Sequence, residues 1–305
     1  MTVALALLIA LILDAIFGEP KKVHPLVLFG AWASRIEEWL ILPRDRVSIN
    51  QKFHGLLALM LSVLPIFGVI LILVQWPLFN ELLSSVLLYL CIAPNSLRQH
   101  TLDIYQPLQK GNLPQARQAI AMIVSRETQQ MDAQAIRKAT IESTLENGVD
   151  AIFAPIFWFV IAGPAGAIFY RLSNTLDAMW GYKNTRYYHF GYAPARLDDI
   201  LNWIPARLTA LSYLLLGDSQ KAWFCYRQQS PLCESPNAGV VMSAGAGCLN
   251  VKLGGSAIYH GQLKNKPLLG TGRSATNQDI LRANHLILLT TLLWLALISL
   301  GEFLA

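Results

Sequence analysis

Three carboxylates recur every four residues in the middle of the chain. They are Glu142, Glu146 and Asp150, and Asn147 lies beside them. Residues four apart share one face of a helix, so this spacing predicts an acidic stripe. Clustered carboxylates repel one another unless a cation binds, and such oxygen ligands suit Mg²⁺. The spacing alone favours a solvated face on which Lys138 pairs with Glu142. However, the stripe leads directly into an apolar stretch, where a solvated face is not expected.

A second polar cluster, "NTLDAMWGYKNTRYYHFGYAPARLDD", occupies residues 174–199 between two apolar stretches. Its Lys and Arg side chains could bind phosphate, Arg through a planar fork and Lys as a point charge. A basic loop with an aromatic belt at a membrane surface would explain Lys, Arg and Tyr. A helix N-cap would explain one of the two adjacent Asp residues, but not both. The candidate binding and catalytic residues here are Asn174, Asp177, Tyr182, Lys183, Asn184, Arg186, Arg196, Asp198 and Asp199.

The third stretch, "SPNAGVVMSAGAGCLNVKLGG", covers residues 235–255. Ser followed by Pro predicts a helix start. The small residues that follow permit close approach by a ligand, or equally by another helix. No G-x-x-x-x-G-K-[ST] motif occurs in the chain, so a nucleotide site would not be a P-loop. Asn237, Gly254 and Gly255 are the candidate site residues here.

The composition indicates a membrane protein. Of 305 residues, 54% are hydrophobic and 14% charged, against about 25% charged residues in soluble proteins. The net charge of +5 could indicate nucleic acid, but the positive-inside rule explains it, and we expect no nucleic-acid partner. The four cysteines form no C-x-x-C pair, which argues against a zinc site or a redox dithiol.

The apolar segments predict the architecture. Four of them, 1–17, 55–75, 77–93 and 284–304, approach the ~20 residues that cross a bilayer. Two further runs are interrupted, 151–170 by Gly and Pro and 200–217 by Pro205 and Arg207, as in helices that line a cavity or pack on protein. We therefore expect an all-α polytopic membrane protein with about four full transmembrane helices and two broken or re-entrant helical segments. Residues 1–305 would form a single integral membrane domain with cytoplasmic helical loops, the catalytic ones within about 95–283.

The basic residues allow two topologies. Six Lys or Arg lie in 18–54, six in 95–150 and seven in 217–283. With four spans, 95–283 is cytoplasmic. If both interrupted runs also cross, only 171–199 moves outside. The charge rule is satisfied in either case.

Five motifs follow one another along the chain: "GEPKKVHPLVLFG", "IESTLENGVDAIFAPIFW", "NTLDAMWGYKNTRY", "FGYAPARLDDILNWIPARLTA" and "SPNAG…KLGG". Together they resemble the cobalamin-biosynthesis CbiB/CobD family, the adenosylcobinamide-phosphate synthases, over about residues 14–273. Three departures are visible. Ser125-Arg126-Glu127 replaces the Gly-Arg-Asp that is common in the family, Glu19 replaces a common Asp, and the middle of the "SPNAGVVMSAGAGCL" stretch differs in detail.

The resemblance implies an ATP-dependent ligase. The enzyme would join aminopropanol or its O-phosphate to the propionate carboxylate of adenosylcobyric acid, giving adenosylcobinamide or its phosphate. It would use ATP and Mg²⁺, and take a corrinoid and an amino alcohol as substrates. It would lie in the lipid bilayer of the inner (plasma) membrane, with other late cobalamin-pathway membrane enzymes as candidate partners. Because ATP is cytoplasmic, the active-site loops would be cytoplasmic too, which favours four spans.

Roles can be assigned on this basis. The expected metal ligands are Glu142, Glu146, Asp150 and Asp177. The expected catalytic residues are Glu146, Asn147, Asp177, Lys183 and Arg186. The expected substrate- and phosphate-binding residues are Arg126, Asn174, Tyr182, Asn184, Arg196, Asp198, Asp199, Arg207, Asn237, Gly254 and Gly255.

Two other classes remain open. A transporter should show internal repeats, and none is apparent. A non-catalytic sensor like the AmpE group would have no reason to keep both the acidic stripe and the cluster at 174–199.

Overall fold

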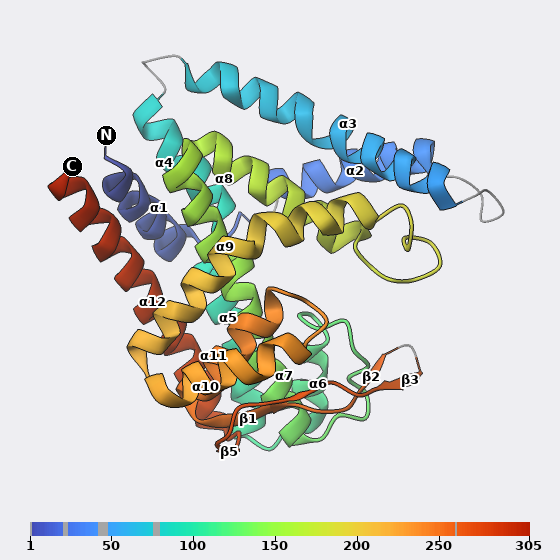
Figure 1. The fold of residues 1–305 in the computed structure, drawn as a ribbon, viewed down its shortest axis with the longest axis vertical. Helices are drawn as coiled ribbons and strands as arrows, with labels where there is room; N and C mark the ends of the chain where they lie inside the picture. The colour runs from blue at the N-terminus through green and yellow to red at the C-terminus, as the bar shows by residue number, and fades with distance from the viewer. Residues whose placement is uncertain (1, 21–23, 42–47, 76–79, 260) are drawn as a thin grey trace. The chain divides into compact units, whose positions relative to one another are not determined.

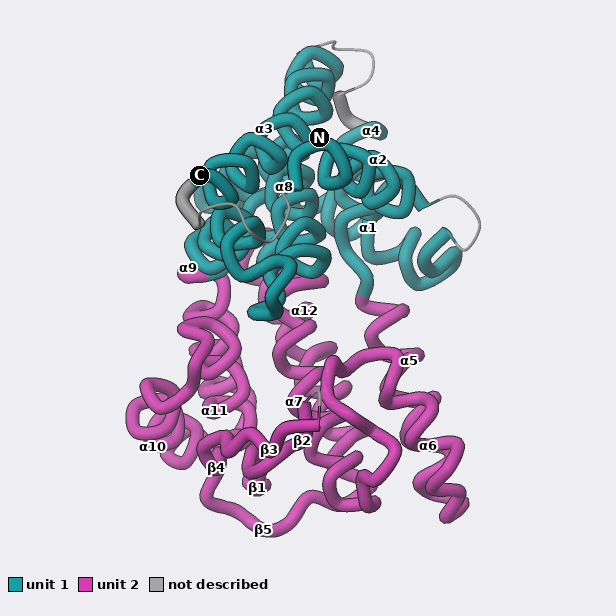
Figure 2. The backbone as a smooth tube through the Cα atoms, turned by 90° about the vertical axis from the view of Figure 1, so that its right-hand side faces the viewer, with its two compact units in different colours: residues 1–93, 154–202, 302–305 teal, residues 94–153, 203–301 magenta. Residues whose placement is uncertain are grey.

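The fold is described by a computed structural model, which covers the chain except residues 1, 21–23, 42–47, 76–79 and 260 (Figure 1). The described residues are mostly helical and form two compact units (Figure 2). Unit 1 consists of Met1–Ala93, Ala154–Asn202 and Glu302–Ala305, and unit 2 of Pro94–Phe153 and Trp203–Gly301. The single membrane domain expected for residues 1–305 stays a prediction.

Unit 1 is a bundle of apolar helices. Helix α4 packs on α1 and α8, and α3 packs on α2 and α8. Its core contains Phe29, Ile36, Leu176, Trp180 and Phe190. The helices are α1 (Val3–Phe17), α2 (Pro25–Leu40), α3 (Ser48–Val74), α4 (Asn80–Cys91), α8 (Ala154–Trp180) and the first part of α9 (Tyr192–Leu216).

The two ends of the chain meet in unit 1. The Glu302 carboxylate accepts the backbone N–H groups of Val3 and Ala4, the latter at 3.0 Å. The first N–H groups of a helix have no partner within it and carry a partial positive charge. Glu302 therefore caps the start of α1 from the last turn of α12.

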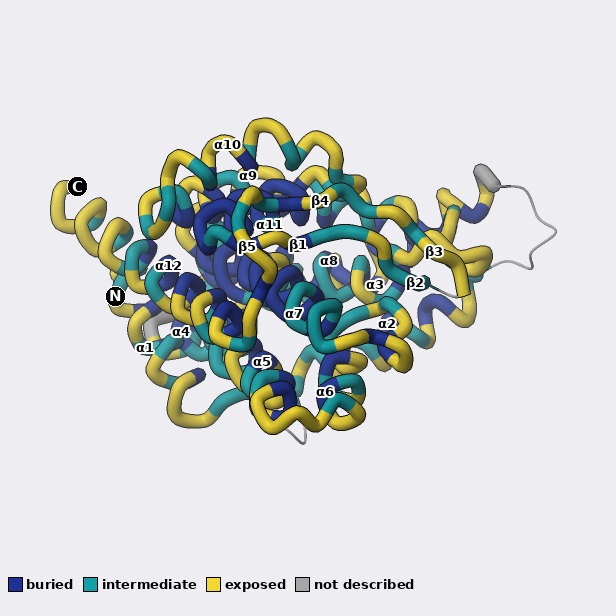
Figure 3. The backbone as a smooth tube through the Cα atoms, turned by 90° about the horizontal axis from the view of Figure 1, so that it is seen from below, coloured by how far each residue is buried: buried dark blue, intermediate teal, exposed yellow. Residues whose placement is uncertain are grey.

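Unit 2 surrounds one almost fully buried helix, α11, which packs on α10 and α7. Every residue of α11 except Met242 is buried (Figure 3). A Cβ at Gly245 would lie 2.6 Å from Leu145 of α7, so the small residues serve helix packing. The helices are α5 (Pro94–Gln109), α6 (Leu113–Ile120), α7 (Ala133–Gly148), the π-helix η1 (Val149–Phe153), the rest of α9, α10 (Ser219–Gln229), the 3₁₀ turn η2 (Ser230–Leu232), α11 (Ala238–Leu249) and α12 (Asn277–Leu304).

Among its described residues, unit 2 also contains five short strands. The sequence predicts an all-α chain and does not predict these strands. Strand β1 pairs antiparallel with β4 and parallel with β5, and β2 pairs antiparallel with β3. Segments of two to four residues are too short to show the alternation by which strands are recognised. The strands are β1 (Val251–Gly254), β2 (Ala257–Tyr259), β3 (Gln262–Lys264), β4 (Leu268–Leu269) and β5 (Arg273–Ser274).

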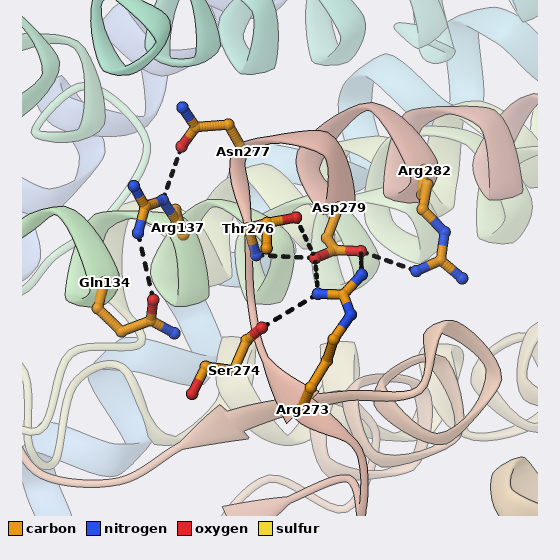
Figure 4. A network of polar contacts seen from close by, with 8 residues as sticks. All are labelled: Gln134, Arg137, Arg273, Ser274, Thr276, Asn277, Asp279 and Arg282. Carbon is orange, nitrogen blue, oxygen red and sulfur yellow. Dashed lines mark hydrogen bonds and ion pairs between the residues drawn. The ribbon is translucent and has the colours of Figure 1, made fainter. Parts of the chain in front are cut away.

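A buried aspartate organises the start of α12 (Figure 4). Asp279 is fully buried and forms ion pairs with Arg273 at 2.6 Å and Arg282 at 2.7 Å. It also accepts the N–H and hydroxyl of Thr276, both at 2.7 Å. Hydrogen-bond donors occupy both oxygens of the carboxylate. We therefore infer that this cluster has a structural role and holds β5 next to the start of α12.

The membrane prediction is confirmed in part. Among the described residues, three helices are long and apolar enough to cross a membrane: Asn50–Val74, Ala133–Trp180 and Asn277–Leu304. They contain residues 55–74 of the expected span 55–75 and all of the expected span 284–304. Helix α1 has 15 residues and α4 has 12, both shorter than a span. Residues 77–79 of the expected third span lie outside the described residues, and the count of four is not confirmed.

The expected interruption in 151–170 is present. Within α8, Ala162 and Gly163 leave the helical conformation, Gly163 with a φ of 62°. The second interrupted run lies in α9, which begins at Tyr192 and not near Ile200.

Candidate functional site

The predicted site residues divide between the two units, and each group is described by itself. Unit 2 contains Arg126, Glu142, Glu146, Asn147, Asp150, Arg207, Asn237, Gly254 and Gly255; unit 1 contains Asn174, Asp177, Tyr182, Lys183, Asn184, Arg186, Arg196, Asp198 and Asp199.

In unit 2, the buried carboxylate of Glu142 on α7 accepts a hydrogen bond on each of its two oxygens. Arg126 donates to one oxygen at 2.7 Å, and the backbone N–H of Gly254 donates to the other at 2.7 Å. Lys138 donates instead to the carbonyl oxygen of Gly254 at 3.1 Å. The expected Lys138–Glu142 pair is therefore wrong, because Arg126 takes the carboxylate and Lys138 reaches the β1 backbone.

The glycine pair at the end of β1 makes this contact possible. Gly254 has a φ of +72°, and a Cβ there would lie 2.0 Å from the carbonyl oxygen of Pro267. Such a conformation favours glycine. Gly255 also has a positive φ, +93°. Gly254 thus contributes both its backbone groups to contacts with α7, whereas the N–H of Gly255 donates to the carbonyl of Pro267 at 3.4 Å.

Arg126 is held in its charged form. Burial lowers the pKa of Arg126, but the charge and hydrogen bond of Glu142, with a contribution from Glu146, raise it above its ordinary value. Glu146 lies one turn beyond Glu142, and its side chain is exposed. We call the group formed by Arg126, Glu142, Glu146 and Gly254 the α7 cluster.

Asn147 turns back onto its own helix. Its side-chain amide donates to the carbonyl and the hydroxyl of Ser143, at 2.8 and 2.9 Å. The Ser143 hydroxyl in turn donates to the carbonyl of Ile123 at 3.2 Å. This relay supports the segment that carries Arg126.

The four predicted metal ligands are not equally suited to bind a metal ion. Among the described residues, no group of three or more His, Cys, Asp or Glu side chains is arranged to hold a metal. Glu142 is a poor ligand, since both its oxygens have protein donors. Glu146 and Asp150 are better placed, one on α7 and one in the π-helix η1. One or two carboxylates suffice for Mg²⁺ that is also held by phosphates, and π-helical turns are frequent at functional sites. Asp177 lies in unit 1, and its backbone carbonyl accepts the N–H of Gly181 at 2.6 Å.

Arg207 and Asn237, predicted from separate motifs, meet in unit 2. Arg207 donates to the side-chain oxygen of Asn237 at 3.4 Å and to the carbonyl of Trp203 at 2.7 Å. Its guanidinium lies 4.0 Å from the centre of the Trp203 ring. The Ser235 hydroxyl accepts the N–H groups of Asn237 and Ala238. It therefore stabilises the turn ahead of α11, but the N-cap position of this helix is Asn237, so the expected arrangement of Ser235 as N-cap and Pro236 at N1 is wrong.

In unit 1, a hydrogen-bonded network centres on Asp198, which is 9% exposed. Asn174 and Asn202 each donate to one of its oxygens, both at 3.0 Å. The Tyr170 hydroxyl donates to the Asn202 oxygen at 3.0 Å, and Arg171 donates to the Asn174 oxygen at 3.3 Å. The structure therefore brings together two predicted residues, Asn174 and Asp198, and adds three that were not predicted. We call these five residues the Asp198 network.

The two adjacent aspartates have different surroundings. Burial raises the pKa of Asp198, opposed by the two amide hydrogen bonds and assisted by the charge of Asp199. Burial also raises the pKa of Asp199, opposed by Arg196 and Lys183. Arg196 lies 3.6 Å from Asp199. Since α9 begins at Tyr192, neither aspartate is an N-cap, and that alternative is wrong.

Arg186 is bound within unit 1 by a residue that the sequence analysis missed. Glu37 of α2 is buried and accepts Arg186 Nε at 2.9 Å and Nη2 at 2.6 Å. It also accepts the indole N–H of Trp180 and the hydroxyl of Tyr187, both at 2.9 Å. Only the isolated acidic pair in an apolar segment, Glu37 and Glu38, hinted at this role.

The loop between α8 and α9 is shaped by its own residues. The side-chain oxygen of Asn184 accepts the N–H groups of Arg186 and Tyr187, at 3.0 and 2.9 Å, which is an Asx-type turn. A Cβ at Gly191 would lie 1.8 Å from the Trp180 carbonyl oxygen, so the loop closes onto the end of α8. Tyr182 and Lys183 are exposed. Asn184 thus has a local structural role.

Comparison with known proteins agrees with the motifs. The sequence profile of the CobD/Cbib protein family matches residues 7–287. The chain is 47% identical over 304 residues to a cobalamin biosynthesis protein CobD of Stutzerimonas stutzeri, covering 100% of this chain and 99% of the relative. It is 48% identical over 299 residues to the protein of that name in Chromobacterium violaceum, covering 97% and 96%. The protein of that name in Leptospira interrogans is 37% identical over 297 residues, covering 93% of each.

No solved structure matches the chain significantly. The profile match spans both units and all the predicted site residues, and the identities extend over nearly the full length of both chains. The chain therefore belongs to the CobD/Cbib family.

Proposed function

We propose that this protein acts in cobalamin biosynthesis as an ATP-dependent amide ligase. It joins the amino group of aminopropanol, or of its O-phosphate, to the propionate carboxylate of adenosylcobyric acid. The product is adenosylcobinamide or its phosphate. The enzyme lies in the inner membrane, with its catalytic loops in the cytoplasm, where ATP is available.

The α7 cluster is the single observation that carries this proposal. Arg126, Glu142 and Gly254 come from three separate stretches of the chain, and they are joined by direct hydrogen bonds. The cluster presents a charged guanidinium and the exposed carboxylate of Glu146 within a largely apolar protein. Ionised groups are expensive in an apolar setting. A cluster of this kind is therefore a candidate functional site.

The chemistry requires such a cluster. A carboxylate is a poor electrophile, and transfer of a phosphoryl group from ATP would convert it into an acyl phosphate. The Mg²⁺ that accompanies ATP would be held by Glu146 and Asp150. Arg126 and Lys138 supply positive charge where the phosphates carry negative charge, and such preorganised electrostatic contacts lower the barrier. Glu142 keeps the Arg126 side chain in place.

The test is direct. The protein is purified in detergent and incubated with adenosylcobyric acid, Mg²⁺-ATP and either aminopropanol or its O-phosphate. We expect an amide product by mass spectrometry, formed together with ADP and only when ATP is present. A folded protein that yields no amide with either amino alcohol would contradict the proposal and favour a transporter or a non-catalytic sensor. The isosteric Glu146→Gln variant serves as the control for contaminating activity.

A further inference from the structure

The antiparallel ribbon of unit 2 is interrupted at Gly255. Strand β1 pairs with β4 and β2 pairs with β3, but the residues between these pairs belong to no strand. The N–H of Gly255 donates to the carbonyl of Pro267 at 3.4 Å. Next to it, the Ser256 hydroxyl donates to the side-chain oxygen of Asn265 at 2.7 Å. Lys266 lies between these two partners in the chain and is therefore held beside the interruption.

A second lysine reaches the same interruption from α7. The Lys138 ammonium donates to the carbonyl of Gly254 at 3.1 Å and lies 3.6 Å from the position that a Cβ on Gly255 would take. Within the described part of the chain, neither Lys138 nor Lys266 forms an ion pair. Both side chains are partly exposed. Two positive charges without an acidic partner therefore favour an anionic ligand at this place.

The β2–β3 hairpin is attached to the segment that carries Arg126. The backbone N–H of Glu127 donates to the carbonyl of Ile258 at 2.9 Å, and the Glu127 carboxylate accepts the N–H of Gly261. Tyr259 lies between the two anchored residues. The hairpin thus places Tyr259 near Arg126, close enough for an electrostatic effect on the guanidinium.

Tyr259 in turn directs Lys266 toward the α7 cluster. The Lys266 ammonium lies 4.9 Å from the centre of the Tyr259 ring, where the aromatic face attracts a cation. Burial raises the pKa of the nearby Cys233 thiol, the charge of Lys266 lowers it, and the two carboxylates of the α7 cluster raise it. Lys266 and these carboxylates are therefore all within electrostatic range of one sulfur atom. Tyr259 is partly exposed and Glu146 is exposed, so a ligand can reach the cluster from solvent.

We propose that Lys266 binds the triphosphate chain of ATP together with Arg126 and Lys138, and that Tyr259 positions the Lys266 ammonium. This inference rests on the proposed ligase function and adds the hairpin to its phosphate-binding site. All of these residues belong to unit 2. Lysine binds phosphate as a point charge. Three cations from separate segments suit the several negative charges of a triphosphate better than the single phosphate group of aminopropanol O-phosphate.

Binding of Mg²⁺-ATP can be measured without any ligation. The purified protein in detergent is titrated with Mg²⁺-ATP alone, and the dissociation constant is obtained by calorimetry. Lys266→Gln removes the charge, so we expect the Kd to rise about 10-fold or more, the scale of one hydrogen bond to a charged group. The KM values for adenosylcobyric acid and for both amino alcohols should stay close to those of the wild type.

Lys264→Gln is the matched control. Lys264 ends the adjoining strand β3, but its ammonium is paired with Glu234 at 2.7 Å. Loss of an exposed ion pair has little effect on stability, and this lysine is not available to a phosphate. Binding of Mg²⁺-ATP should therefore be unchanged. Equal weakening by Lys264→Gln and Lys266→Gln would show that only the overall charge of the ribbon matters, and would overturn the inference.

Two substitutions of Tyr259 test the positioning role, and they replace the first test if Lys266→Gln does not fold. Tyr259→Phe keeps the ring beside Lys266 and should bind Mg²⁺-ATP like the wild type. Tyr259→Leu removes the ring and should raise the Kd. If the folded fraction of Tyr259→Leu binds as tightly as Tyr259→Phe, the ring has only a structural role and the inference is wrong.

The results distinguish this inference from the ligase function. A wild type that forms the amide, with a Lys266→Gln variant that binds Mg²⁺-ATP equally well, would overturn the inference alone. An effect of Lys266→Gln confined to the KM for aminopropanol O-phosphate would also overturn it. A wild type that binds Mg²⁺-ATP through Lys266 but forms no amide would contradict the ligase function alone. A folded wild type that does not bind Mg²⁺-ATP would contradict both.

Discussion

Arg186 and Glu37, 149 residues apart in the chain, are joined by two hydrogen bonds to a single carboxylate oxygen. Trp180 and Tyr187 donate to the same carboxylate. The side chain of Arg186 is 53% exposed and that of Glu37 is 7% exposed. This geometry favours a structural role for Arg186, in holding the loop after α8, over the catalytic role expected from its sequence motif.

Truncation of Glu37 should therefore destabilise unit 1. Glu37→Ala leaves the buried indole N–H of Trp180 without its partner, at a cost of about 1–3 kcal/mol. Arg186→Lys should have a smaller effect, because lysine keeps the charge but lacks the fork. Thermal unfolding in detergent measures both. We expect the folded fraction of Arg186→Lys to ligate within a few-fold of the wild-type rate, and a fully folded but inactive variant would restore Arg186 to the catalytic group.

Glu142 and Glu146, one turn apart, should respond in opposite ways to the same substitution. Glu142→Gln removes the charge that balances the partly buried Arg126, so we expect a lower Tm. Glu146→Gln alters an exposed side chain and should leave the Tm unchanged, but abolish ATP-dependent turnover through loss of a Mg²⁺ ligand. Near-normal activity of Glu146→Gln at saturating Mg²⁺ would remove this residue from the site.

A substitution of Arg207 can show whether this residue contacts a ligand or only packs within the protein. Arg207→Lys keeps the charge but loses the planar stack on Trp203 and the contact with Asn237. If Arg207 contacts phosphate or the substrate carboxylate, turnover should fall by roughly 100-fold or more, with little change in Tm without ligand. An unstable variant whose surviving fraction is fully active would show that Arg207 only supports α9.

The stability of the protein should depend on pH through Asp198. Its pKa in the folded state is raised by burial above the unfolded value of about 3.9. Its contribution to stability is therefore fully present below about pH 4 and is lost as the pH rises through the folded pKa. Asp198→Asn removes this titration, so the Tm of the variant should exceed that of the wild type at pH 7, with a smaller difference at pH 4. An equal decrease in Tm at both pH values would show that the hydrogen bonds of the carboxylate outweigh its burial.

Labelling with an impermeant thiol reagent can test the expected sidedness. Asn112 and Asn184 are both exposed and suit single cysteines in a cysteine-free background. If the catalytic loops are cytoplasmic, both positions should be protected in intact cells and labelled after lysis. Labelling of position 184 alone would mean that both interrupted apolar runs cross the membrane.

Local signals predicted much of this structure. Gly163 and Pro164 marked the break in α8, and the Ser235-Pro236 pair lies just ahead of α11, which begins at Ala238. Relationships between distant residues were not predictable in the same way, because no periodicity links Glu37 to Arg186 or Glu142 to Gly254. The start of α9 was placed too late, because the chain enters the helix directly after Gly191, whose lack of a side chain allows close contact with Trp180.

The cap that Glu302 provides for α1 constrains the number of membrane crossings. The start of the first helix and the end of the last are hydrogen-bonded to each other, so both termini must emerge on the same side of a bilayer. A chain with both ends on one side crosses an even number of times. Among the residues that the structure describes, three helices are long and apolar enough to span. Three is an odd number, so either a shorter apolar helix completes a fourth crossing or one of the three does not cross. Reporter tags fused to the two termini should accordingly always report the same compartment.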